Sequence, residues 1–191
     1  MLSGLLLGSL PETVDCCGKT VQIYTDFRVW IEVERILFEQ EGDFLAKIPA
    51  MLKLCYPVLP DTLEAAVAGM TCFYTGQETG DEKNLHTNRL KPVYSFCQDA
   101  ALIYAGFYQQ YGIDLTTAEL HWYQFRALLS GLGEETLFGR VLGYRMMDLS
   151  SLKNKGKRQF YAKMKSLYRL KDYRTEEEKE AAVSTALAGL F

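Results

Sequence analysis

Two consecutive helical patterns between Tyr94 and Leu132 constrain the fold of this chain more than any other feature. In the first, aromatic and apolar side chains recur at three- and four-residue steps, which places them along one face of an α-helix. Gly112 supplies a left-handed helix end. Thr116 and Glu119 are spaced as a capping box for a second helix that presents Trp122, Phe125, Leu129 and Leu132 on one face. The sequence therefore predicts two adjacent helices rich in aromatic side chains.

The residues before this block predict a β-hairpin followed by helices. Val14 and Cys16 alternate with polar residues ahead of a turn at Gly18-Lys19, which is typical of a short hairpin. Helices are expected from Asp26 to about Glu41, from Phe44 to Cys55 with a break at Pro49, and from the N-cap Asp61 to Gly76. The expected fold class is mainly α, a compact helical bundle with a small N-terminal β-hairpin.

The length of the chain favours a single domain over residues 1–191. With 191 residues, of which 48% are hydrophobic, the chain can bury one sizeable core. The stretch 77–91 is polar, has no apolar period and reads as a loop. If the domain has a subdivision, we expect it at this loop, between a hairpin-plus-helices half, 1–76, and an aromatic helical half, 92–191.

The last third of the chain predicts a helix over about 134–147, with Leu137, Val141 and Tyr144 on one side, and then a basic helix. Residues 153–171 carry eight cationic side chains together with an apolar stripe. The stripe consists of Phe160, Met164, Leu167 and Tyr168. An acidic run over 176–180 then suits the first turn of a final helix.

No residue pattern in the chain indicates a catalytic, metal or cofactor site. Glu119 lies two positions from His121 and so on a different helix face, which favours a structural or surface role for this histidine. The five cysteines lack paired zinc-site spacing, and we expect reduced thiols. The glycines are scattered and form no phosphate loop. We therefore expect no enzyme activity and no cofactor.

Charge and hydropathy make nucleic acid and membrane weak candidates as partners. The net charge is −3, whereas phosphate binding needs a concentrated basic excess. For the basic helix 153–171, a solvated face is the favoured interpretation, since the acidic run 176–180 lies close enough to reduce its field within a Debye length of about 8 Å. The apolar opening MLSGLLLGSL has no basic flank and is too short to span a bilayer. We expect an intracellular protein.

Several segments resemble one known family. LPETV at 10–14, GKTVQIYTDFRVWI at 18–31, YGIDL at 111–115, LHW at 120–122 and FGRVLGYRMMDL at 138–149 are similar to motifs of the bacteriophage gene-product-fifteen family, small proteins of long-tailed phages and prophages. Genes of this family typically precede the tape-measure gene, so the resemblance implies a role in tail assembly inside the host bacterial cytoplasm. It implies no reaction.

This resemblance leads to a chaperone hypothesis with named contact residues. The two aromatic helices carry rings on more than one line, and we expect some to form a groove for the helical tape-measure protein, while the basic helix contacts acidic client stretches. The expected partner-binding residues are Phe107, Tyr108, Tyr111, Trp122, Tyr123, Phe125, Lys157 and Arg158. A core role for the rings remains open.

Other partners and functions also remain open. The tail-tube protein and a second copy of the chain are further expected partners. The alternative functions are a structural tail component, such as a connector or completion subunit that uses the hairpin to add strands, and a small nucleic-acid-binding protein.

Overall fold

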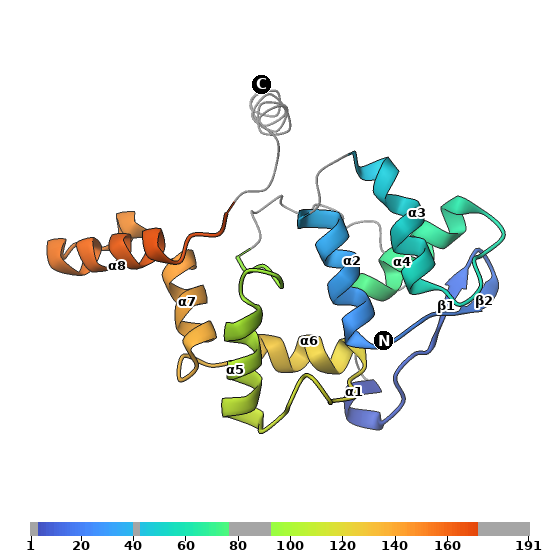
Figure 1. Cartoon of the computed structure of the whole chain (residues 1–191), viewed down its shortest axis with the longest axis horizontal. Helices are drawn as coiled ribbons and strands as arrows, with labels where there is room; N and C mark the ends of the chain where they lie inside the picture. The colour runs from blue at the N-terminus through green and yellow to red at the C-terminus, as the bar shows by residue number, and fades with distance from the viewer. Residues whose placement is uncertain (1–3, 40–42, 77–92, 172–191) are drawn as a thin grey trace.

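The computed structural model describes residues 4–39, 43–76 and 93–171. It is mainly helical with one two-stranded antiparallel sheet near the N-terminus, which confirms the predicted fold class. The elements are, in order, α1 (Gly4–Leu7), β1 (Thr13–Cys16), β2 (Lys19–Gln22), α2 (Phe27–Glu39), α3 (Phe44–Cys55), α4 (Leu63–Thr75), α5 (Ala100–Tyr111), α6 (Trp122–Ser130), α7 (Leu137–Met146), the short 3-10 helix η2 (Leu149–Ser151) and α8 (Lys155–Leu167). The hairpin and α8 lie at opposite ends of the long axis (Figure 1).

The hairpin forms where the alternation predicted it, but its turn is one residue earlier. Lys19 already pairs with Cys16, so the turn consists of Cys17 and Gly18, whose φ angles are 55° and 84°. Two left-handed residues in a two-residue loop match the right-handed twist of a hairpin. Cys16, the last residue of β1, is buried, whereas Cys17 in the turn is exposed.

The hairpin packs on α4 at a glycine. A Cβ atom at Gly69 would lie 2.7 Å from the Cys16 Sγ and 3.1 Å from a methyl group of Val14, so only the missing side chain allows this approach. Helix α4 also contacts α3. The hairpin is therefore supported by the helical body, as an isolated hairpin must be.

Two predicted boundaries in this half are wrong. Helix α3 continues through Pro49, although the ring cannot donate the interior hydrogen bond. Thr62, not Asp61, caps α4, since its hydroxyl accepts a hydrogen bond from the Ala65 N–H at 3.3 Å. Asp61 instead forms an exposed ion pair with Lys19 of the hairpin, a partner that local sequence does not indicate.

The second aromatic helix starts five residues later than predicted. Thr116 caps no helix: its N–H and hydroxyl both donate to the Asp114 carboxylate, at 2.9 and 2.6 Å. Helix α6 begins at Trp122, whose N–H donates to the Thr25 carbonyl at 2.7 Å, while the Phe27 N–H donates to the Leu120 carbonyl at 3.1 Å. This backbone bridge fixes the starts of α2 and α6 side by side. It also prevents the segment before Trp122 from joining helix α6.

The hydrophobic core contains residues from both sides of the segment 77–92. It extends from Val14 on the hairpin to Phe138 on α7, and its centre is a set of stacked rings. Their polar atoms reach backbone carbonyls: the Trp30 Nε1 donates to Tyr24 at 2.8 Å, and the Tyr123 hydroxyl donates to Phe73 at 2.8 Å. Buried aromatic rings with satisfied polar ends stabilise a core at little electrostatic cost.

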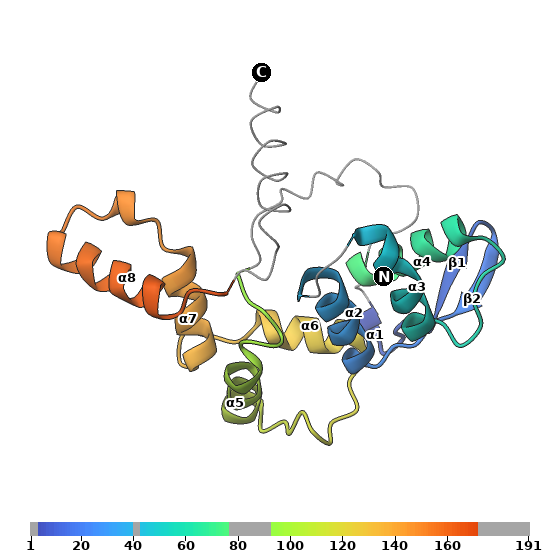
Figure 2. The same ribbon diagram turned by 45° about the horizontal axis from the view of Figure 1, so that its top comes forward.

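The C-terminal described part forms an extension that we call the arm, defined as α7, η2 and α8. Figure 2, a tilted view, shows α8 projecting from α7 at the end of the molecule opposite the hairpin. Thr136 caps α7 with a 3.0 Å bond from the Gly139 N–H, and Phe138 and Val141 are buried. Of the predicted inward face, Val141 is buried and Tyr144 is half-buried, whereas Leu137 is 39% exposed and its neighbour Phe138 lies in the core instead.

Two predicted segments and the question of a membrane span remain. The predicted loop 77–91 and the predicted final helix from 176 lie outside the described residues. Within the described residues, no helix has the length and apolar character needed to cross a membrane.

Candidate functional site

Four of the rings expected to bind a partner belong to the core. Phe107 and Phe125 are 0% exposed, and Trp122 and Tyr123 are 1% exposed. The ring of Phe125 stacks on those of Phe27 and Phe107, with centroid distances of 4.7 and 5.2 Å. These four side chains pack inside the protein and present no surface to a partner. The prediction that they line a partner-binding groove is therefore wrong.

The other two rings differ from each other. Tyr111 is half-buried, and its hydroxyl donates to the Leu128 carbonyl at 2.9 Å, so it fastens α5 to α6. Tyr108 is 59% exposed and stacks on Tyr104 at a centroid distance of 6.3 Å. Of the six aromatic residues named from the sequence, Tyr108 alone lies largely in solvent.

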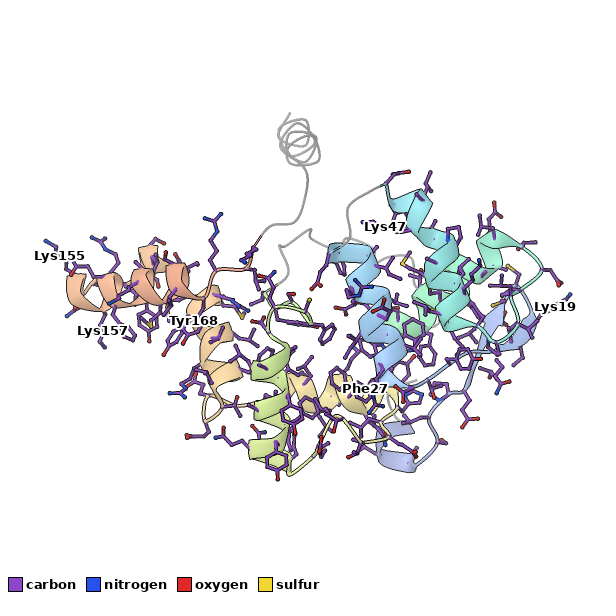
Figure 3. The ribbon with its side chains drawn as sticks, viewed as in Figure 1. Lys19, Phe27, Lys47, Lys155, Lys157 and Tyr168 are labelled. Atoms are coloured by element: carbon purple, nitrogen blue, oxygen red, sulfur yellow. The ribbon has the colours of Figure 1, made fainter. Side chains whose placement is uncertain are left out.

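Lys157 and Arg158 lie on the arm, on a helix with a solvent-exposed apolar edge. Helix α8 contains no buried residue, and Phe160 and Leu167 are 50% and 66% exposed. These two residues are seven positions apart and so share one helix face. We call this pair the apolar strip. Figure 3 shows Lys155 and Lys157 at the outer end of α8 and Tyr168 close to α7.

The inner face of α8 packs on α7 through aromatic side chains. The Tyr144 ring of α7 lies 6.1 Å from Tyr161 and 6.0 Å from Tyr168, both centroid distances. The Lys165 ammonium group also donates to the Met147 carbonyl at 2.9 Å. Phe160 borders this packing, since its ring lies 6.2 Å from that of Tyr144, yet half of its side chain stays in solvent, as does most of the Leu167 side chain.

A buried ion pair fastens the arm to the body. Arg145 donates to both carboxylate oxygens of Asp99, at 2.6 and 2.8 Å, and the two side chains are only 11% and 3% exposed. The same guanidinium donates to the carbonyls of Val93, at 3.0 Å, and Tyr168, at 2.7 Å. Arg145 thus joins α7, the start of α5 and the end of α8. The sequence does not indicate this pair, because α7 carries two arginines, Arg140 and Arg145, and their spacing does not show which one is buried.

The end of α8 is held by a second contact. The Lys171 N–H donates to the Gln98 Oε1 at 2.9 Å, and the Gln98 Nε2 donates back to the Lys171 carbonyl at 3.2 Å. Together with the bond from Arg145 to Tyr168, this amide pair returns the chain after α8 to the body. The arm is therefore attached at its base and at the end of α8.

His121 has a structural role, as expected, at the start of α6. Its Nδ1 accepts a hydrogen bond from the Tyr123 N–H at 3.1 Å, and the Gln124 Oε1 accepts one from the His121 N–H at 3.0 Å. The Nε2 lies 3.0 Å from the Pro11 carbonyl, an acceptor, so this nitrogen carries the proton of a neutral ring. Burial lowers the pKa of His121, against a smaller opposing effect of the Pro11 carbonyl.

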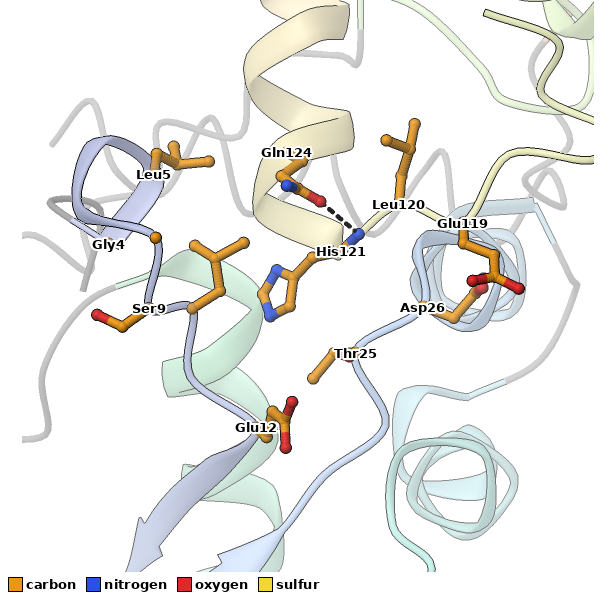
Figure 4. Close-up of a pocket in the computed structure, with 12 residues that line it drawn as sticks. Gly4, Leu5, Ser9, Glu12, Thr25, Asp26, Glu119, Leu120, His121 and Gln124 are labelled. Carbon is orange, nitrogen blue, oxygen red and sulfur yellow. Dashed lines mark hydrogen bonds between the residues drawn. The ribbon is translucent and has the colours of Figure 1, made fainter.

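In the groove beside His121, two of the titratable side chains are already hydrogen-bonded within the protein. The groove has a volume of about 710 Å³ and lies between the N-terminal segment, the Thr25-Asp26 link and the start of α6 (Figure 4). Asp26 in its wall already binds the Arg28 side chain at 3.2 Å, and both His121 nitrogens are engaged. The groove therefore marks where the N-terminal segment packs on the body.

We predict that His121 makes stability pH-dependent. The pKa of His121 in the folded protein lies below the ordinary 6.5, so between these two pH values the unfolded chain binds more protons than the folded protein. The contribution of His121 to stability is therefore complete above pH 6.5 and is lost as the pH falls through the folded-state pKa. Urea unfolding between about pH 7 and about pH 5.5 should show a steeper loss for the wild type than for His121→Asn, which keeps a cap acceptor but does not titrate. Equal slopes would contradict the assignment.

The thiols and carboxylates of the described residues form no metal site. Cys16, Cys55 and Cys72 are buried, and burial raises the pKa of the Cys55 thiol to about 12. A protonated, buried thiol neither attacks a substrate nor binds a metal at neutral pH. These three cysteines act as small core side chains.

Comparisons with known proteins give the family. The family model described as Bacteriophage Gp15 protein matches residues 6–170. No curated protein and no solved structure matched the chain. The matched range includes the hairpin, the aromatic core, and all of the arm. The chain belongs to the bacteriophage Gp15 protein family.

Proposed function

We propose that the protein is a non-enzymatic phage tail-assembly protein, a chaperone that binds the helical tape-measure protein in the host bacterial cytoplasm before tail-tube subunits polymerise. The observation that carries this proposal is the arm: a helix without buried residues presents Phe160 and Leu167 to solvent next to lysine side chains. Membership of a phage protein family supports the setting. A second expected partner is the tail-tube protein, which would meet the complex next.

The physical task explains why such a surface is useful. A long amphipathic chain aggregates through its apolar faces until a tube encloses it, and a partner that covers those faces keeps it dispersed. Recognition of a helix by its face tolerates many sequences. Weak contacts repeated along one client chain give avidity and still allow displacement.

The roles of the buried polar groups support binding over chemistry. Asp99 and Arg145 neutralise each other, His121 caps a helix, and the Tyr74 hydroxyl donates to Glu34 at 2.5 Å. Each of these groups is engaged within the fold. A catalytic acid or nucleophile needs a free face toward a substrate.

Co-expression with the tape-measure protein encoded in the same phage tests the proposal. We expect the client to be soluble and to copurify with this protein, and to be mainly insoluble when expressed alone. A variant that removes the arm contacts, Phe160→Ser/Leu167→Ser, should release the client, whereas Leu45→Ser/Leu63→Ser, which changes equally exposed leucines of α3 and α4, should not. A client that is soluble and uncomplexed without the protein would refute the chaperone function.

A structural tail component is the second candidate, and the hairpin favours it. A groove of about 390 Å³ lies between β2 and the 58–62 link, next to the exposed side chains of Val58 and Leu59. An added strand or an apolar segment of a neighbouring subunit fits such an edge. Stoichiometric amounts of the protein in purified virions would favour this role, because a chaperone is absent from the finished tail.

A further inference from the structure

The exposed face of α8 combines apolar side chains with positive charge. Phe160 and Leu167 are exposed, and the two are separated by two helical turns, about 10 Å along the axis. On a helix, Lys157 and Lys163 lie three positions before and after Phe160 and so border the apolar strip on either side. Residues 149–171 contain eight cationic side chains and no carboxylate.

Resting on the proposed function, we propose that the apolar strip of α8 is the client-binding surface and that its occupant is an acidic amphipathic helix laid along α8. The apolar stripe of this helix covers Phe160 and Leu167. Its flanking Asp or Glu side chains pair with Lys157 and Lys163. The client segments recognised are therefore those in which carboxylates border an apolar stripe.

Charge complementarity selects this occupant over a second copy of the chain. A second copy would bring its own α8, with the same lysines, against the first, and like charges at short distance repel. The ion pairs of the described residues all lie outside α8, so none of their carboxylates pairs with its lysines. An acidic helix neutralises this charge and covers the strip at once.

The apolar strip also favours a protein over nucleic acid. Phosphate backbones are bound by cationic faces, and a duplex offers no surface that buries a phenylalanine and a leucine on a helix side. On α8, Phe160 and Leu167 share a helix face that Lys157 and Lys163 border on either side. Helix-in-groove recognition has this arrangement, with apolar anchors at the centre and charges at the rim.

The arm is built to receive a helix without refolding. Tyr144 and Lys165 hold the inner side of α8, and the Gln98–Lys171 amide pair holds the chain after it. The binding face is therefore ordered before the client arrives, which lowers the entropy lost on association.

A fluorescence-anisotropy titration with the full chain tests the proposal. The probe is a labelled synthetic helix of about 20 residues, with leucines at heptad spacing and glutamates on both borders of the leucine stripe. We expect binding that weakens as salt rises from about 0.05 M to about 0.3 M. The same peptide with lysines in place of the glutamates should not bind.

Matched variants locate the surface. Phe160→Ser/Leu167→Ser and Lys157→Glu/Lys163→Glu should each weaken peptide binding by about 10-fold or more, the usual scale for interface anchors. The apolar control is Leu45→Ser/Leu63→Ser, and the charge control is Lys155→Glu/Arg158→Glu, which changes the other side of the same helix; both should stay within about 3-fold. Leu167→Ser alone, at a largely exposed side chain, serves if the double variant does not fold.

Several outcomes would overturn the proposal. If the charge control lost as much peptide affinity as the strip variants, net charge alone would explain the binding. Tighter binding of a DNA duplex of about 20 base pairs than of the acidic peptide would make the arm a nucleic-acid surface. A dimer that dissociates on Phe160→Ser/Leu167→Ser, in sedimentation, would make the strip a contact between copies. A tape-measure client that stays soluble with that variant would leave the chaperone function standing and refute this surface alone.

Discussion

Replacing Phe125 by alanine is expected to lower the free energy of unfolding by about 3–5 kcal/mol, the usual cost of removing a buried phenylalanine ring. The side chain is 0% exposed, and four other rings lie around it, those of Phe27, Phe96, Phe107 and Trp122, at centroid distances between 4.7 and 6.0 Å. These rings come from α2, α5, α6 and the segment before α5. The cavity left by alanine would therefore lie where the core elements meet.

Urea unfolding, followed by circular dichroism, measures this effect. Tyr108→Ala is the control, because this ring was named from the same sequence pattern but is 59% exposed; its replacement should change stability by no more than about 0.5 kcal/mol. A loss of client binding in Phe125→Ala would then report unfolding, not a lost contact. If the two variants had equal stability, the buried position of Phe125 would be refuted.

Replacing Arg145 by methionine is expected to have a similarly large effect, about 3–5 kcal/mol, because it leaves the Asp99 carboxylate buried without its partner. Asp99 is 3% exposed and accepts two hydrogen bonds from the guanidinium. The substitution also removes the bonds to the carbonyls of Val93 and Tyr168. We expect the arm to separate from the body more often, so trypsin should cut the lysine-rich α8 faster.

The controls separate charge burial from helix propensity. Arg140→Met changes an exposed arginine on the same helix and should stay within about 0.5 kcal/mol of the wild type. The double variant Arg145→Met/Asp99→Leu should recover part of the loss, since no unpaired charge remains buried. If Arg145→Met were as stable as Arg140→Met, the Asp99–Arg145 ion pair would not contribute to the stability of the fold.

Patterns of short range in the sequence predicted the fold class well. The alternation around Val14 and Cys16 located the hairpin, because successive strand residues point to opposite faces. The three- and four-residue spacing and Gly112 located α5 and its left-handed end, at φ 67°. These features depend only on residues close in the sequence, so they can be predicted without knowing where the element packs in the protein.

Helix starts were missed where a distant partner decided them. Thr116 followed by Glu119 satisfies a capping box, yet the backbone bridge between 25–27 and 120–122 starts α6 at Trp122, with His121 as its cap. Asp61 satisfies an N-cap, yet it pairs with Lys19 on the hairpin. At α6 a backbone contact across the chain outweighed a local preference worth about 1 kcal/mol, whereas at α4 the neighbouring Thr62 provides the cap.

The candidate site was only partly predictable for a similar reason. A helical stripe of rings has the same spacing whether it faces a core or a partner, so the pattern left both roles open for Trp122 and Phe125. Basic character located α8 and Lys157 correctly on a surface helix. Which edge of the helix stays open depends on where Tyr144 packs, and no periodicity of α8 contains that information.

The Gln98–Lys171 amide pair has a consequence for how association is timed. The pair ties the chain after α8 to the body, so in the proposed complex the conformational search would fall to the client segment, which must become helical as it binds. Mutating Gln98 would release the chain after α8, so that both α8 and the client segment would have to find their bound conformations. The encounter would then slow, while the lifetime of the finished complex would change much less.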